Sequence, residues 1–120
     1  MNLKECYLAA GADYEDMIRR FINEERADRF LALFLKDQSF NELCGAMDEE
    51  RYEDAFRAVH TIKGICMNLG LTALSSSCVD LTENLRQRRL DGDTQRFFEQ
   101  VKKDFERTAS AINQHFRPGE

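Results

Sequence analysis

Residues 52–70 read Tyr52-Glu53-Asp54-Ala55-Phe56-Arg57-Ala58-Val59-His60-Thr61-Ile62-Lys63-Gly64-Ile65-Cys66-Met67-Asn68-Leu69-Gly70. With an advance of about 100° per residue, apolar side chains of this stretch fall within roughly 40° of one direction: Ala55, Val59, Ile62, Cys66 and Leu69. The spacing predicts a helix from about Tyr52 to Leu69 that buries this stripe. Gly70 is expected to end the helix as a left-handed cap residue.

A histidine lies on the other side of this predicted helix. On the helical wheel His60 is ~140° from the centre of the apolar stripe, Gly64 is ~180° from it, and Lys63 lies at the flank near ~80°. His60 is therefore expected to be exposed, whereas a lone histidine among apolar residues more often belongs to the core. Lys63 can neutralise an anion held on the imidazole, because residues three apart are neighbours on a helix surface. Gly64 costs roughly 1 kcal/mol of helix stability relative to alanine, and its lack of a side chain lets the backbone of another protein approach the ring.

Further amphipathic segments precede this helix. Leu3 to Ala10 and Tyr14 to Phe21 predict two short helices, the second of them N-capped by Asp13. A stripe at three- and four-residue steps then predicts an amphipathic helix: Ala27, Phe30, Leu31, Phe34 and Leu35. Ser39 and Glu42 match a capping box that starts another helix, so this region is either one kinked helix or two nearly collinear ones. Residues 48–51 form the predicted turn before Tyr52.

Two more helices are predicted after Gly70. The first buries the stripe Leu71, Leu74, Cys78, Leu81 and Leu85 and turns other residues elsewhere: Ser75, Ser76, Ser77, Glu83 and Asn84. After a turn at residues 91–93, the last helix is expected from about Thr94 to Phe116, with Phe98, Val101, Phe105, Ala109 and Ile112 facing inward. Four main stripes with short polar turns predict an all-α fold. The expected architecture is an antiparallel up-down-up-down four-helix bundle with short extra N-terminal helices.

The composition is that of one globular domain spanning residues 1–120, with a hydrophobic fraction of 42% and a charged fraction of 32%. The only proline is Pro118, in the tail, and no train of short β-branched runs occurs, which favours an all-helical chain. A net charge of −5 argues against nucleic acid as a partner. The densest basic group, Arg86, Arg88 and Arg89, is interpreted as a solvated helix end.

Neither a signal peptide nor a membrane span is expected, because the amino terminus lacks a long apolar run. Four cysteines, Cys6, Cys44, Cys66 and Cys78, occur without Cys-x-x-Cys spacing, which argues against a zinc site. They are expected to be reduced, small core residues of a cytoplasmic protein.

The segment His60-Thr61-Ile62-Lys63-Gly64, followed by Leu69-Gly70, resembles the signature of the histidine-containing phosphotransfer (HPt) domain family. That signature reads His-x-(Leu/Ile)-Lys-Gly, then four residues, then Leu-Gly, and the likeness extends more loosely over almost the whole chain. The resemblance implies a four-helix bundle that carries phosphate between receiver domains on one exposed histidine, without binding ATP or phosphorylating itself. The chain departs from the family at Ile65, Cys66 and Met67, where small residues are common.

The resemblance implies a role for each residue of the site. His60 is the expected phosphoacceptor, Lys63 stabilises the phosphate charge, and Gly64 gives the partner access. Phe56, Arg57 and Met67 are expected to form the docking surround, although Phe56 and Met67 can equally pack at the edge of the bundle. Arg57 is a second candidate source of positive charge. No cofactor or metal is expected on this chain, since Mg²⁺ would be held by the partner receiver. His115 is expected to be solvated or to cap a helix.

The preferred functional hypothesis is a stand-alone, monomeric, cytoplasmic carrier of a two-component phosphorelay, working with response-regulator receiver domains, a hybrid histidine kinase or both. No Walker motif or Gly-rich phosphate loop is present, so the chain is not expected to be an enzyme with its own kinase activity. Two alternatives stay open. The chain can be the phosphoacceptor module of a chemotaxis-type histidine kinase, which shares Phe56-Arg57 and the motif at His60. It can also be a helical adaptor that binds receivers without phosphotransfer.

Overall fold

The computed structural model describes residues 1–88 and 90–117. These residues form α1 (Leu3–Ala9), α2 (Tyr14–Phe21), α3 (Glu24–Lys36), α4 (Ser39–Asp48), α5 (Tyr52–Leu69), α6 (Thr72–Leu85) and α7 (Gly92–Phe116). No β-strand occurs among the described residues, which confirms the all-α class. Arg89 and Pro118, which entered the sequence analysis, lie outside the described residues.

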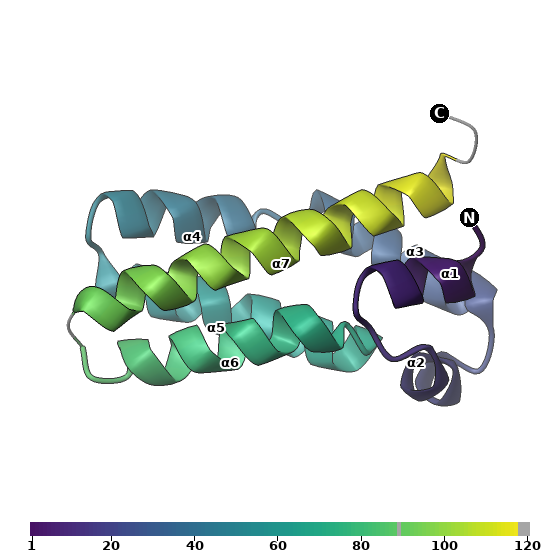
Figure 1. Ribbon diagram of the computed structural model, residues 1–120, viewed down its shortest axis with the longest axis horizontal. Coiled ribbons are helices and arrows are strands. Elements are labelled where there is room, and N and C mark those ends of the chain that lie inside the picture. The colour runs from purple at the N-terminus through teal and green to yellow at the C-terminus, as the bar shows by residue number, and fades with distance from the viewer. Residues whose placement is uncertain (89, 118–120) are drawn as a thin grey trace.

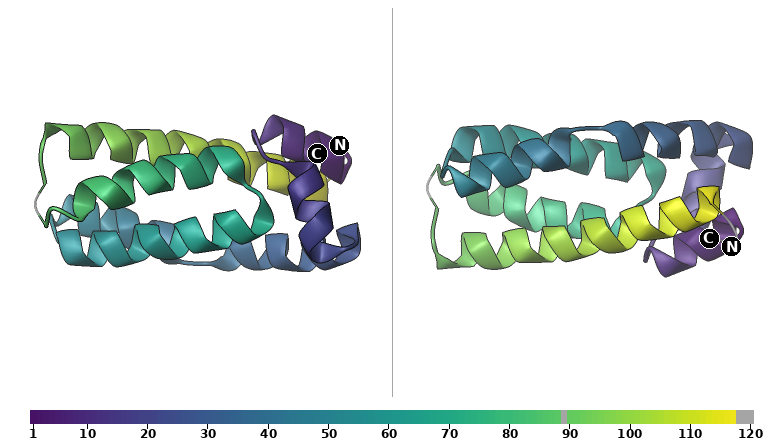
Figure 2. Two further views of the ribbon diagram at one scale, coloured as in Figure 1. Left: turned by 90° about the horizontal axis from the view of Figure 1, so that it is seen from below. Right: turned by 90° about the horizontal axis from the view of Figure 1, so that it is seen from above.

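Helices α4 to α7 lie along the long axis of an elongated molecule of 41 × 30 × 19 Å (Figure 1). Helix α5 packs against both α4 and α6, and α6 also packs against α7. The turn at Gly70 joins α5 to α6 at one end, and the segment before α7 joins α6 to α7 at the other end (Figure 2). Helix α5 also contacts α2 and α3, and its exposed face carries His60, Thr61 and Gly64.

The core consists of the stripes that helical periodicity predicts. In α5 the five predicted side chains are at most 2% exposed. In α6 and the residue before it, the stripe from Leu71 to Leu85 is buried as well. One member of the predicted polar set is different: Ser77 is also buried, and its hydroxyl donates to the Leu74 carbonyl oxygen at 3.1 Å. A serine can enter the core at this position because its own helix supplies the acceptor.

The structure corrects the predicted start of α4. The sequence predicts two nearly collinear helices or a kinked one, and the chain forms two, α3 and α4, which follow one another along the same edge (Figure 2). The predicted capping box of Ser39 with Glu42 is wrong. Ser39 already lies inside α4, and its N–H donates to Oδ1 of Asp37 at 2.9 Å. Asp37 is extended, so its carboxylate is placed to satisfy a free N–H of the following helix.

Two apolar stripes differ in part from their predictions. Phe30 of α3 is 49% exposed, while its neighbours Ala27, Leu31 and Phe34 are buried. In α7, Ala109 is only half-buried, and Thr108 and Ala111 take its place in the core. Helix α7 also begins at Gly92 rather than near Thr94. Its N-cap is Asp91, whose Oδ1 accepts the N–H groups of Asp93 and Thr94, both at 3.0 Å.

The short helices α1 and α2 close the end of the bundle where α5 meets α6 (Figure 2). The Tyr7 hydroxyl donates to the Leu69 carbonyl oxygen at 2.7 Å, and the Asp13 N–H donates to the Gly70 carbonyl oxygen at 2.8 Å. Asp13 is also the N-cap of α2, as predicted. From α7, Arg107 Nε donates to the Ala9 carbonyl oxygen at 2.7 Å. These bonds fix the carboxyl end of α5 and hence the position of the helix that carries His60.

Candidate functional site

Helix α5 begins and ends where the sequence predicts, and both ends have a physical cause. Its first turn carries Glu53 and Asp54, whose negative charges favour the positive end of the helix dipole. Its last carbonyl groups are capped by Gly70, which has φ 69° and ψ 24° in the left-handed region. His60 therefore lies near the middle of an 18-residue helix.

His60 is exposed, as predicted, and its ring is held by the preceding turn. The imidazole stacks on the ring of Phe56, with centroids 5.9 Å apart and planes inclined by 23°. Phe56 is half-buried, and the guanidinium carbon of Arg86, the C-cap residue of α6, lies 5.3 Å from its ring centroid. Both predictions for Phe56 therefore apply: it packs at the edge between α5 and α6, and it flanks His60.

Lys63 and Gly64 lie on opposite sides of His60. Lys63 is half-buried on the side of α6, where its charge opposes the burial that raises the pKa of the Cys78 thiol to about 12. Gly64 is exposed, and a Cβ added there would have no atom within 4 Å beyond its own helix. Open space at Gly64 means that no packing contact of the described residues requires the glycine. Lys63 therefore lies on one flank of His60, and the open surface at Gly64 lies on the other.

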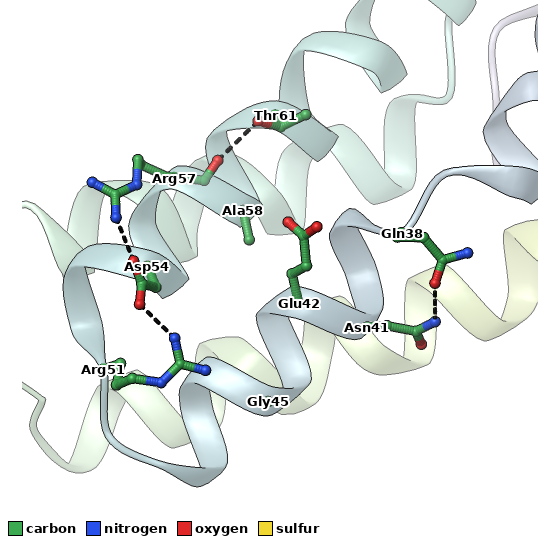
Figure 3. Close-up of a pocket in the computed structure, with 9 residues that line it drawn as sticks. All are labelled: Gln38, Asn41, Glu42, Gly45, Arg51, Asp54, Arg57, Ala58 and Thr61. Atoms are coloured by element: carbon green, nitrogen blue, oxygen red, sulfur yellow. Dashed lines mark hydrogen bonds and ion pairs between the residues drawn. The ribbon is translucent and has the colours of Figure 1, made fainter.

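Arg57, three residues before His60, borders a groove of about 670 Å³ between α4 and α5 (Figure 3). Its guanidinium pairs with the Asp54 carboxylate, which also pairs with Arg51. Hydrogen bonds from these two arginines hold the pKa of Asp54 below its usual value. Sequence analysis named Arg57 but missed Asp54 and Arg51. The spacing Arg51-x-x-Asp54-x-x-Arg57 is the signal that could have found them, because residues three apart meet on a helix.

Among the exposed apolar side chains of the described surface, those at two places lie on α5 or in a groove that α5 helps to line. Met67, one helical turn beyond Lys63, is 53% exposed on the face of His60, as the wheel predicts. The second place is a groove of about 450 Å³ between α2, α3 and α5, lined in part by Phe21, Phe30 and Leu33. Sequence analysis did not identify this groove, because Phe30 was assigned to the core.

The second histidine, His115, lies in a different setting from His60. It was expected to be solvated or to cap a helix, but its side chain is only 14% exposed and its Nε2 lies 2.8 Å from Oδ1 of Asp28. The pair joins α7 to α3, far apart in the sequence. Burial and this contact with Asp28 take one ring nitrogen of His115 out of reach, whereas the ring of His60 is exposed and stacks on Phe56.

The cysteines are unpaired with one another among the described residues. All four cysteines are free thiols. Cys66 and Cys78 are buried, as their apolar positions predict, and Cys6 is buried as well, whereas Cys44, also predicted to be a core residue, is only half-buried. Burial raises the pKa of Cys6 to about 11. Over the described ranges, 1–88 and 90–117, no three His, Cys, Asp or Glu side chains are grouped to hold a metal ion. Within the same ranges, no helix has the length and apolar character that a bilayer crossing requires.

Comparison with models of protein families gives a match over most of the chain. The model of the Hpt domain family matches residues 16–111, which is most of the chain and includes α5 with its exposed histidine. No curated protein and no solved structure matches the chain.

Proposed function

The chain belongs to the Hpt domain family, and from this premise we propose that His60 carries a phosphoryl group between receiver domains in a two-component phosphorelay. Hpt domains are phosphocarrier modules of two-component signalling rather than enzymes. The observation that supports the proposal best is the setting of His60: an exposed imidazole stacked on Phe56, with Lys63 on one side and the open surface of Gly64 on the other.

The proposed reaction is a reversible exchange between two carriers. A ring nitrogen of neutral His60 attacks the phosphorus of a receiver aspartyl phosphate, so that a P–N bond forms while the P–O bond to the aspartate breaks. The aspartate leaves as a carboxylate, and the phosphoimidazolium releases its ring proton to solvent. Lys63 offsets the negative charge beside the ring, and Phe56 limits its rotation. Mg²⁺ is proposed to act from the receiver, so this chain needs no cofactor of its own.

Docking is proposed to use the exposed face of α5. Gly64 lets the receiver backbone approach, while Phe56, Arg57 and Met67 surround the imidazole. Catalysis of phosphoryl transfer depends mainly on positioning and charge, and this face supplies both without a deep pocket. The antiparallel up-down-up-down order of α4 to α7 belongs to the same proposal. The packing of α4 on α5, α5 on α6 and α6 on α7 supports it.

We further propose a monomer that acts in the cytoplasm. A monomer leaves the His60 face open to its partner, and a mass near 14.0 kDa in sedimentation equilibrium is the expected result. Four free cysteines suit a reducing compartment. The hypothesis of a stand-alone carrier is tested by the size of the native protein in cell extracts. A phosphoacceptor module of a chemotaxis-type kinase would instead be found within a longer polypeptide.

Transfer from a phosphorylated receiver tests the central proposal. Wild type, His60→Gln and His115→Gln are each mixed with phosphorylated receiver domains of the source organism, with and without Mg²⁺. Acid-labile label is expected on wild type and on His115→Gln and not on His60→Gln, and only with Mg²⁺ present. Label retained by His60→Gln would refute the assignment. A receiver that binds wild type without transferring label would favour the adaptor hypothesis.

A further inference from the structure

Asp54 shares its carboxylate between two arginines, one on each side along the chain. Arg51 pairs with Oδ2 and Arg57 pairs with Oδ1 (Figure 3). Arg51 is also 3.5 Å from Oε1 of Glu49. The Arg57 side chain is the more exposed of the two arginines, at 71% against 45%. Asp54 therefore keeps one partner, Arg51, if Arg57 moves away.

Arg57 is within reach of His60 but is directed away from it. Residues three apart share one helix surface, and side chains lean toward the amino end of the helix. The stacking of His60 on Phe56 shows that the imidazole leans this way, over the turn that also carries Arg57. Yet the Arg57 guanidinium lies toward Asp54, at the amino end of α5, on the opposite side of Arg57 from Thr61 (Figure 3).

On the basis of the proposed function, we propose that Asp54 is a positioning residue that holds Arg57 in reserve, and that Arg57 exchanges Asp54 for the phosphoryl group once His60 is phosphorylated. A phosphoryl group adds negative charge and three acceptor oxygens, which suit the planar fork of an arginine. Arg51 stays on Asp54, so the exchange leaves no carboxylate unpaired. The phosphoryl-transfer step itself, with its bonds and proton, is the one written above.

The exchange has a consequence for a carrier that must both accept and release phosphate. Arg57 stabilises the phosphorylated state only after it has given up its pair with Asp54. Asp54 therefore subtracts from the stability of phosphohistidine, and it keeps the equilibrium with the receiver close to balance. An arginine without this competing carboxylate would hold the phosphate more tightly.

The equilibrium distribution of label between a receiver and His60 measures this effect directly. The ratio depends on the two free proteins and not on the encounter complex, so a change in docking alters the rate and leaves the ratio unchanged. Asp54→Asn should raise the ratio of phospho-His60 to phosphoreceiver by about two- to fivefold, the range of an exposed ion pair. Arg57→Gln should lower it by a similar factor.

The double variant separates the proposal from a simple effect of charge. In the Arg57→Gln background, Asp54→Asn should no longer change the ratio, because Asp54 acts through Arg57. Glu53→Gln is the matched control, because it removes one negative charge from the same turn of α5. Glu53 has no ion pair among the described residues, so this variant should leave the ratio near that of wild type. The effect of Asp54→Asn should also shrink in 1 M salt, where exposed charges are screened. Thermal unfolding of each variant checks that the populations compared are folded.

The outcomes divide clearly. If Asp54→Asn raises the ratio equally with and without Arg57, the Asp54 charge acts on the phosphate directly and the reserve mechanism is wrong. If wild type takes label on His60 and neither variant changes the ratio, the further inference fails while the phosphocarrier proposal stands. If wild type takes no label on His60 from any receiver, both proposals fall together.

Discussion

The imidazole of His60 stacks on the ring of Phe56, one helical turn earlier, with the ring centroids 5.9 Å apart. Because Phe56 also carries the Arg86 guanidinium at 5.3 Å, this contact connects the histidine to α6 as well as to its own helix. The ring of His60 is thus exposed and yet restricted on one side. A ring held in this way needs less ordering when the partner arrives.

Replacing Phe56 tests whether this restriction contributes to transfer. Phe56→Leu keeps most of the buried apolar surface, so the free energy of unfolding should fall by only about 1 kcal/mol. The transfer rate should fall about two- to tenfold, the range that an aromatic pair contributes beyond its buried area. Rates are measured by quenched-flow transfer from a phosphorylated receiver. Phe97→Leu is a matched control, because Phe97 is also half-buried and also lies under an arginine, Arg96, at 4.7 Å. An equal loss of rate in both variants would contradict a specific role for Phe56.

Substitutions of Gly64 distinguish docking from packing. Gly64→Ala should stabilise the protein by about 0.5–1 kcal/mol, since the added methyl meets nothing and alanine favours the helix. Gly64→Gln should fold nearly as wild type does, because a longer side chain also extends into open space. It should nevertheless slow phosphotransfer strongly, since it keeps the receiver backbone away from His60. Thermal unfolding and transfer rates on the same samples decide the matter. A Gly64→Gln variant that transfers phosphate at the wild-type rate would refute the docking surface.

Substitution of Gly70, at the end of the same helix, should lower the free energy of unfolding, whereas Gly64→Ala should raise it. Its φ of 69° is unfavourable for an L-residue, and an added Cβ would lie 2.9 Å from the Asp13 carbonyl oxygen. Gly70→Ala should therefore destabilise the protein by at least 1–2 kcal/mol, roughly the cost of a left-handed residue alone. Urea unfolding of Gly70→Ala beside Gly64→Ala makes the comparison within one helix. Equal free energies of unfolding for the two variants would show that the backbone around Gly70 and Asp13 rearranges without loss of stability.

Asp91 should make the stability of the protein depend on acid pH. Hydrogen bonds from the Gln87 side chain and the Thr94 backbone hold the pKa of this N-cap carboxyl well below its usual range. The folded-state pKa is lowered, so the stabilisation is complete above the unfolded pKa of about 3.9 and is lost as the pH falls toward the folded value. The urea concentration at the midpoint of unfolding should decrease as the pH is lowered from 5 to 2.5. Asp91→Asn keeps a capping side chain without the charge, so the urea midpoint of this variant should decrease less steeply with falling pH. If the urea midpoint of that variant depends on pH as steeply as that of wild type, other carboxyl groups cause the acid sensitivity.

The sequence by itself determined the helix that carries His60. The bounds of α5, its buried stripe, the exposure of His60 and Gly64 and the cap at Gly70 all agree with the prediction. Each of these follows from the constant rotation per residue of an α-helix, which is a local property of the backbone. Once one stripe is buried, the opposite face has to be outside. The same reasoning predicted the all-α class and the core of α6.

Only the tertiary structure decided the contacts that depend on how helices sit against one another. The capping box at Ser39 was wrong because Asp37, outside the helix, satisfies the backbone first. His115 was expected to be solvated or to cap a helix. The packing of α7 near α3 instead brings it against Asp28. Phe30 has the right period for the core and is exposed because no helix covers its side of α3 fully. Periodicity gives the direction of a side chain, but the partner in that direction is set by the packing of segments far apart in the sequence.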